Sequence, residues 1–310
     1  MTQMQKPPAF KKGDTIGIVA ISRWIKPEEL EKAKSAWESL GYKVKIHPNN
    51  FSHHHEWGGD YQERAKALTE YWNDPEINAI ISARGGLRTL PLLDHIDFNE
   101  LKTPKIIMGA SDITTLLNAL YTQNNIPSFH GPVATRYAGE ATQKHLEETI
   151  SAFDGTQTIF QFNETKTLKE KISTGILVGG NMCNFNYLLG TKYCPDLKEK
   201  ILFLEDDGEE IRNIDRMFLH LKHLGKLDDI SGLIIGGFQD VKNTGSISFP
   251  YSLKDLILEY TDGLDIPVIM NAPFGHGKDL LPLPIGINAK LSTTKTTATL
   301  ELLEPAVKNA

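Results

Sequence analysis

Residues 105–123 read KIIMGASDITTLLNALYTQ, and this stretch decides the fold. The apolar run at 106–108 has the length and β-branched composition of a buried strand. Apolar side chains then recur with the period of an amphipathic helix, at Ile113, Leu116, Leu117, Leu120 and Tyr121. The sequence therefore predicts a strand that passes through a short turn, residues 109–112, into a helix.

Ser111 lies on this turn, where two interpretations compete. Small neighbours let the backbone bend sharply and expose a hydroxyl, and the amides that begin a helix stabilise developing negative charge. That arrangement suits a nucleophilic serine. The alternative is that Ser111 or Asp112 only caps the helix, since both residue types are favoured at that position. The pattern G-x-S-D is weaker than a full G-x-S-x-G elbow, so the rest of the chain must decide.

Length and composition limit the class of protein. The chain has 310 residues, enough for about two domains with their own cores. A net charge of −6, with no basic stripe, argues against nucleic acid or an anionic membrane as partner. No apolar run has the length of a membrane span or a signal peptide, and Cys183 and Cys194 do not make a disulfide framework. We therefore expect a cytoplasmic protein with free thiols.

The first half of the chain alternates strand and helix patterns. Strands are predicted at 15–21, 42–47, 77–82 and 106–108, and helices begin at Pro27 and Tyr61. Such alternation is typical of a parallel sheet covered on both faces by helices. We predict an α/β N-terminal domain of the flavodoxin or Rossmann type over residues 1–140.

The second half has a different character. Residues 141–173 are rich in Thr, Lys, Glu and Gln, and we interpret them as a linker. Strand patterns at 201–204, 233–235 and 266–270 follow, and the tail at 286–303 alternates Thr with apolar residues as antiparallel strands do. The sequence predicts a smaller, mixed α/β C-terminal domain over residues 174–310.

Three chemically active residues follow predicted strands. Ser111, Glu205 and His276 each stand at the carboxyl end of a short apolar run, and in α/β sheets the binding crevice lies outside those ends. Histidine can take the proton of a serine hydroxyl, and a carboxylate orients the histidine. Taken alone, His276 could be a loop residue between two glycines, and Glu205 could be a surface acid or a charge at a helix N-terminus.

Several separate motifs resemble the LD-carboxypeptidase family of serine peptidases, which includes muramoyltetrapeptide carboxypeptidases and microcin C self-immunity peptidases. The motifs are GDTIGIVAIS, ARGG, IIMGASDIT, FHGPV, GGNMCNFNYLLGT, ILFLEDDGEE with IDRMF, and FGHG with LPLPIG. The resemblance implies a nucleophile at Ser111, a triad carboxylate at Glu205 and a general base at His276. It also implies an oxyanion hole of backbone N–H groups near Gly86 and Asp112, no metal or organic cofactor, and a homodimer.

Arginines near the expected pocket are candidates for substrate recognition. Many members of the family continue the RGG motif with Tyr-Gly, whereas here Leu87 and Arg88 follow, and Arg212 stands where a tyrosine is frequent. A carboxypeptidase must bind a free carboxylate, for which the planar guanidinium is well suited. Arg84, Arg88 and Arg212 are therefore candidates, and the alternative for each is a surface or structural salt bridge.

Residues 53–55 are three adjacent histidines, which invite a metal interpretation. Consecutive side chains on a loop do not converge on one ion without partners, because zinc sites use spaced ligands. We therefore interpret this segment as a solvated or substrate-rim loop and predict no metal site.

The function predicted from the sequence is hydrolysis of an amide bond between an L-centre and a terminal D-residue. By resemblance, the substrate is a small peptide or muropeptide, and the product is D-alanine released from a murein tetrapeptide in cell-wall recycling. A first alternative is a self-immunity-like peptidase that cleaves an aminoacyl or peptidyl nucleotide antibiotic, with Trp24 or Trp57 as platform for the base. A second is a non-catalytic α/β ligand-binding module, although the chain lacks G-x-G-x-x-G and G-x-x-x-x-G-K-[ST] after its first strand.

Overall fold

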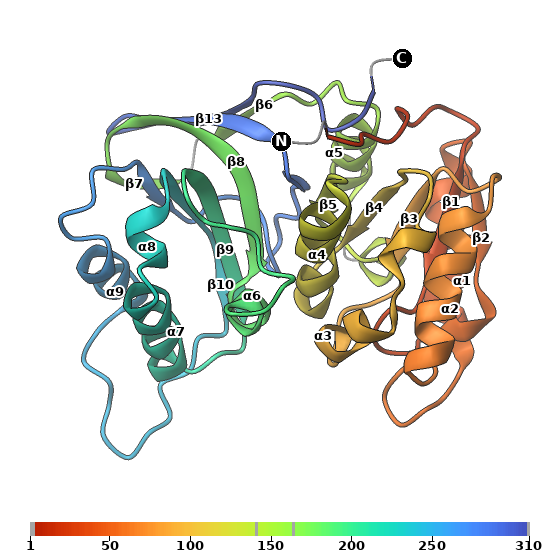
Figure 1. The fold of residues 1–310 in the computed structure, drawn as a ribbon, viewed down its shortest axis with the longest axis horizontal. Helices are drawn as coiled ribbons and strands as arrows, with labels where there is room; N and C mark the ends of the chain where they lie inside the picture. Colours follow the sequence, from red (N-terminus) through yellow and green to blue (C-terminus); the bar gives the residue numbers. More distant parts are fainter. Residues whose placement is uncertain (1–3, 140–141, 163–164, 309–310) are drawn as a thin grey trace.

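The computed structural model describes residues 4–139, 142–162 and 165–308. Within them the chain forms two sheets that lie side by side (Figure 1). The first sheet has six strands in the order β12-β5-β4-β3-β1-β2. Their bounds are β1 Thr15–Val19, β2 Lys43–Ile46, β3 Ala79–Ser82, β4 Ile106–Gly109, β5 Ser128–His130 and β12 Leu283–Ile285.

The first sheet confirms the predicted parallel architecture, with one addition. Strands β1 to β5 pair in parallel, and β12, from near the end of the chain, pairs antiparallel with β5. Four helices connect the strands: α1 Pro27–Ser39, α2 Tyr61–Asn73, α3 Thr89–Leu92 and α4 Thr114–Asn124. Helix α1 has Pro27 in its first turn, and α2 begins with a capping box between Asp60 and Glu63, so both start where the sequence offers a start signal.

The second sheet has eight strands in the order β6-β14-β13-β8-β9-β10-β11-β7. Their bounds are β6 Ile159–Phe162, β7 Lys166–Lys169, β8 Ile172–Asn181, β9 Lys200–Asp207, β10 Gly232–Gln239, β11 Val268–Met270, β13 Asn288–Thr293 and β14 Ala298–Leu302. The central strands β8 to β11 are parallel, and the flanking pairs are antiparallel. The helices of this half are α5 Gln143–Phe153, α6 Met182–Leu188, α7 Ile211–His223, α8 Lys226–Asp229 and α9 Leu253–Tyr260. This is the mixed α/β half that the sequence predicts.

The segment interpreted as a linker, 141–173, differs from that expectation where the structure describes it. It holds α5, β6 and β7, and the two strands form the opposite edges of the second sheet. Both are only four residues long, and β6 buries every second side chain, so neither has the long apolar run that marks a central strand. The exact limits of the two domains stay a prediction.

Helix α4 connects the two sheets. The side chain of Asn118 donates to the carbonyl of Gly179 at 2.8 Å, and the backbone N–H of Asn181 donates to Thr114 Oγ1 at 3.0 Å. A Cβ on Gly180 would stand 2.6 Å from Thr114 Oγ1, so only glycine permits this approach. The helix that follows Ser111 is thereby fixed against the carboxyl end of β8, which is paired with the strand that carries Glu205.

Candidate active site

Ser111 lies on a strained turn between β4 and α4. Its backbone has φ = 60°, in the left-handed region that costs a non-glycine residue about 1 kcal/mol or more. The bend depends on small neighbours, because a Cβ on Gly85 would stand 2.8 Å from Ser111 Cβ and one on Gly109 would stand 2.7 Å from Ile113. Strain of this kind is maintained at functional sites, and a turn of this geometry carries the nucleophile in serine hydrolases with an elbow.

This strain has a measurable consequence for stability. We expect Ser111→Gly to be more stable than Ser111→Ala by about 1 kcal/mol, because alanine keeps the penalty of positive φ and glycine does not. Urea denaturation of the two variants, both without the hydroxyl, measures the difference directly. A Ser111→Ala variant as stable as Ser111→Gly would contradict the strained backbone.

Neither Ser111 nor Asp112 caps the helix with its side chain. The buried carboxylate of Asp112 instead accepts hydrogen bonds from Ser22 Oγ at 2.7 Å, from Thr89 N at 3.0 Å and from Thr89 Oγ1 at 2.6 Å. Burial raises the pKa of Asp112, and these hydrogen bonds oppose the rise. Asp112 therefore fixes the nucleophile turn to the loop that follows β3, which contains Gly86.

Glu205 and His276 form a hydrogen-bonded pair. Glu205 is fully buried near the end of β9, and its Oε2 accepts a hydrogen bond from His276 Nδ1 over 2.6 Å. Gly275 has φ = 114°, and a Cβ there would stand 2.8 Å from Glu205 Oε2, so glycine lets the loop approach the carboxylate. The side chain of His276 keeps 17% of its surface exposed.

The two pKa values of this pair move apart. Burial alone would raise the pKa of Glu205, but the charge and hydrogen bond of His276 outweigh it, and the pKa is lowered. Burial alone would lower the pKa of His276, but Glu205 outweighs it in turn, and the pKa is raised. Glu205 is therefore a carboxylate at neutral pH, and it favours the imidazolium form of His276.

Ser111 and His276 line the same cavity, which has a volume of about 480 Å³. Residues from both halves of the chain contribute to its wall, among them Gly85, Gly86 and Arg84 after β3. Glu205 lies behind His276 and does not line the cavity. The structure thus brings the predicted nucleophile and base to one cavity, with the predicted carboxylate bonded to the base.

Only one of the three predicted arginines reaches this cavity. Arg84 lines it, at the carboxyl end of β3. Arg88 donates to Tyr61 Oη at 2.7 Å and lies over the ring of Trp57, 5.3 Å from its centroid. Arg212 donates to the carbonyl of Ile247. The hydrogen bonds of Arg88 and Arg212 thus go to neutral groups outside the cavity, whereas the alternative predicted salt bridges.

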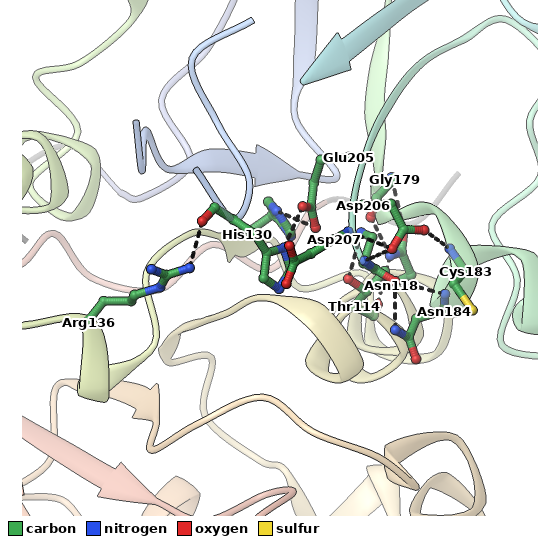
Figure 2. A network of polar contacts seen from close by, with 12 residues as sticks. Thr114, Asn118, His130, Arg136, Gly179, Cys183, Asn184, Glu205, Asp206 and Asp207 are labelled. Atoms are coloured by element: carbon green, nitrogen blue, oxygen red, sulfur yellow. Dashed lines mark hydrogen bonds and ion pairs between the residues drawn. The ribbon is translucent and has the colours of Figure 1, made fainter. Parts of the chain in front are cut away.

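His130 is a buried residue of this site that sequence reasoning missed. Its Nε2 lies 3.7 Å from Glu205 Oε1, and burial lowers its pKa to about 4, so it is neutral (Figure 2). It ends β5, the strand next to the one that delivers Ser111. The FHGPV motif was the available signal, but nothing in it shows that a carboxylate from the other half of the chain covers the ring.

Asp206, the next residue of β9, is a second buried carboxylate. It accepts hydrogen bonds from Asn181 Nδ2 and from the backbone N–H of Cys183, both at 2.9 Å (Figure 2). Burial and the charge of Glu205 raise its pKa to about 6. Asp206 thus binds the start of α6 and fixes the end of β9, where Glu205 lies.

The three adjacent histidines do not line the active-site cavity. His53 packs on the ring of Trp24, with 3.9 Å between ring centroids, and His54 and His55 pack near Trp57. Among the residues that the structure describes, no group of three His, Cys, Asp or Glu side chains is arranged to hold a metal ion.

Within residues 4–139, 142–162 and 165–308, none of the helices has the length and apolar character needed to cross a membrane.

Comparisons with known proteins agree with the fold and the motifs. Residues 16–131 match the model of the LD-carboxypeptidase N-terminal domain, and residues 174–291 match that of the C-terminal domain. A probable murein peptide carboxypeptidase of Bacillus subtilis is 34% identical over 96% of this chain and 94% of its own length. The microcin C7 self-immunity protein MccF of Escherichia coli is 29% identical over 74% of this chain and 75% of its own length.

A solved structure aligns with most of this chain. The muramoyltetrapeptide carboxypeptidase of Oxalobacter formigenes aligns with a TM-score of 0.83 and 28% identity, over 93% of this chain and 98% of its own. The two domain models, the relative from Bacillus subtilis and the aligned structure therefore indicate the same family. The chain belongs to the LD-carboxypeptidase family of peptidases.

Proposed function

We propose that this protein is a serine carboxypeptidase that hydrolyses an LD-amide bond and releases terminal D-alanine from murein tetrapeptides. One observation carries the proposal: Ser111, on a strained turn, shares a cavity with His276, which is hydrogen-bonded to the buried Glu205. The names of the relatives, murein peptide carboxypeptidase and muramoyltetrapeptide carboxypeptidase, support the substrate class.

The proposed reaction begins with attack of Ser111 Oγ on the carbonyl of the L-centre. Nε2 of His276 takes the hydroxyl proton while Nδ1–H stays bonded to Glu205, which stabilises the imidazolium. His276 then gives the proton to the leaving amine, and D-alanine departs from an acyl-enzyme on Ser111. Water that His276 activates hydrolyses the ester, so the scheme uses only side chains, backbone groups and water.

The oxyanion of each tetrahedral intermediate needs donors next to Ser111. We assign this role to the backbone N–H groups of Gly86 and Asp112. Support comes from the close approach of Gly85 to Ser111, which leaves no room for a Cβ, and from the hydrogen bonds of Asp112 with Ser22 and Thr89. Loss of one such donor typically costs about 100-fold in turnover.

A test of the substrate class compares two peptides. We expect the enzyme to release D-alanine from the murein tetrapeptide, whose last bond joins an L-centre to D-alanine. It should leave intact the pentapeptide that ends in D-alanyl-D-alanine, because its last bond joins two D-centres. Mass spectrometry of the products decides, and cleavage of the pentapeptide at a similar rate would contradict the LD assignment.

A second candidate function is cleavage of an aminoacyl or peptidyl nucleotide, as in the self-immunity branch. Trp24 favours it, because it lines a second hollow of about 330 Å³ that shares Arg23, Glu29 and Arg84 with the active-site cavity. Trp57 lines neither hollow. Stabilisation of the protein by an aminoacyl-sulfamoyl adenylate, and not by the tetrapeptide, in a thermal-shift measurement would establish this candidate in place of the first.

We also propose, from the family resemblance, that the protein is a cytoplasmic homodimer. The non-catalytic alternative loses its main support, because it needs Ser111 as a helix cap and the side chain makes no capping hydrogen bond.

A further inference from the structure

A carboxypeptidase must bind the free carboxylate of the residue that it releases. Arginine is the side chain best suited to this task, because its planar fork can donate two parallel hydrogen bonds to one carboxylate. Three arginines line the cavity among the residues that the structure describes: Arg23, Arg84 and Arg136. On the basis of the proposed function, one of these three arginines binds the terminal carboxylate.

The chemistry fixes the side of the cavity on which the leaving residue lies. His276 must deliver its proton to the nitrogen of the leaving residue, so that nitrogen lies next to the imidazole. In an α-amino acid the carboxylate is separated from this nitrogen by a single carbon. The terminal carboxylate must therefore lie within about one residue's length of His276.

Arg136 is the arginine that occupies this position. It lies in the short helix η5, Ala134–Ala138, and its Nη2 donates to the backbone carbonyl of His276 at 2.8 Å (Figure 2). The guanidinium is half-buried at the cavity wall, and the hydrogen bond keeps it next to the residue that carries the base. A partly desolvated cation binds a carboxylate more strongly than an exposed one does.

The other two arginines differ from Arg136 because they also line the second hollow. Arg23 and Arg84 both line the second hollow, together with Trp24 and Lys26, and Arg136 does not. Among the residues that the structure describes, Arg136 is the one of these three arginines that donates a hydrogen bond to the residue carrying the base.

Asp207 also lines the cavity, and its charge acts on Arg136. Burial lowers the pKa of Arg136, while Asp207 and Glu205 raise it, and an arginine side chain stays protonated in either case. The guanidinium of Arg136 therefore stays positively charged over the whole pH range of catalysis.

We propose that Arg136 binds the terminal carboxylate of the substrate and thereby restricts this enzyme to the last residue of a peptide. The alternative is that Arg136 only positions His276 through the carbonyl contact. The two roles differ in one respect: a carboxylate receptor discriminates between a free acid and its amide, and a positioning residue does not.

The test measures kcat/KM for the tetrapeptide as free acid and as C-terminal amide. Wild type should prefer the acid strongly, and Arg136→Gln should lower kcat/KM for the acid by about 100-fold, with a much smaller effect on the amide. Arg136→Lys, which keeps the charge but loses the fork, should retain part of the preference. Arg84→Gln is the matched control, and its ratio of acid to amide should equal that of wild type.

Equal losses on both substrates in Arg136→Gln would overturn the proposal, and so would a collapse of the ratio in Arg84→Gln instead. Product inhibition gives a second measurement: D-alanine should inhibit wild type more strongly than D-alaninamide, and Arg136→Gln should not distinguish them. If wild type releases D-alanine from the acid but Arg136→Gln keeps its preference, only this inference fails. If wild type releases nothing, the proposed function itself fails.

Discussion

Replacing Ser111 with alanine should lower kcat for the release of D-alanine by about 10⁴-fold or more. The proposed reaction has no other nucleophile, because the acyl-enzyme forms on Oγ of this residue, and comparable substitutions in serine proteases have losses of this size or larger. KM should change little, because the cavity keeps its other walls. Steady-state kinetics with the murein tetrapeptide measures both constants.

Ser128→Ala is a suitable control for this substitution. Ser128 is buried on β5, next to the strand that delivers Ser111, and its hydroxyl donates to the carbonyl of Leu117 at 3.0 Å. Its loss should cost stability, about 1 kcal/mol, and leave turnover within a few-fold of wild type. Turnover in Ser111→Ala similar to that of this control would exclude Ser111 as the nucleophile.

Replacing Glu205 with glutamine should have the next largest effect, a loss of about 10⁴-fold in kcat/KM. Glutamine keeps the size of the side chain but removes the charge, and its amide N–H can donate to Nδ1 of His276 and so favour the wrong tautomer. Glu210→Gln is the matched control, because Glu210 stands close in sequence but bonds Thr244 outside the cavity.

The pH profile adds an independent prediction for the same variant. His276 must be neutral to accept the proton of Ser111, so kcat/KM rises as pH increases through its pKa. Glu205 raises that pKa, which places the acid limb of wild type above the ordinary pKa of histidine. The limb should move to lower pH in Glu205→Gln, since the neutral amide no longer stabilises the imidazolium. An unchanged midpoint would mean that Glu205 does not act on His276.

The sequence was sufficient for much of the fold because its patterns are local. The apolar run at 106–108 and the helical period after it predicted the turn at Ser111, which the structure has between β4 and α4. Alternating strand and helix patterns likewise predicted the parallel sheet of the first half, where Ser111 follows β4, whereas Glu205 on β9 and His276 after β11 come from the second sheet. Strand β12 was not predictable, because its three residues pair with β5, more than a hundred residues earlier in the chain.

The neighbours of the candidate triad were less accessible to sequence reasoning. Arg136 donates to the carbonyl of His276, 140 positions later, and His130 lies close to Glu205. Both contacts join distant parts of the chain, so no local sequence pattern indicates them. Arg88 and Arg212 show the reverse case, because they were candidates for substrate binding but do not line the cavity. Their charges suggested a pocket, but their side chains bond Tyr61 and the carbonyl of Ile247, partners that only the folded chain supplies.

The central claim is that Ser111 attacks an LD-amide bond. The most direct test incubates wild type and Ser111→Ala with a murein tetrapeptide and with the counterpart that ends in L-alanine, and follows alanine release by mass spectrometry. We expect wild type to release D-alanine from the first peptide, to leave the second intact, and to lose activity in Ser111→Ala. Release of alanine from both peptides, or undiminished release by Ser111→Ala, would contradict the account.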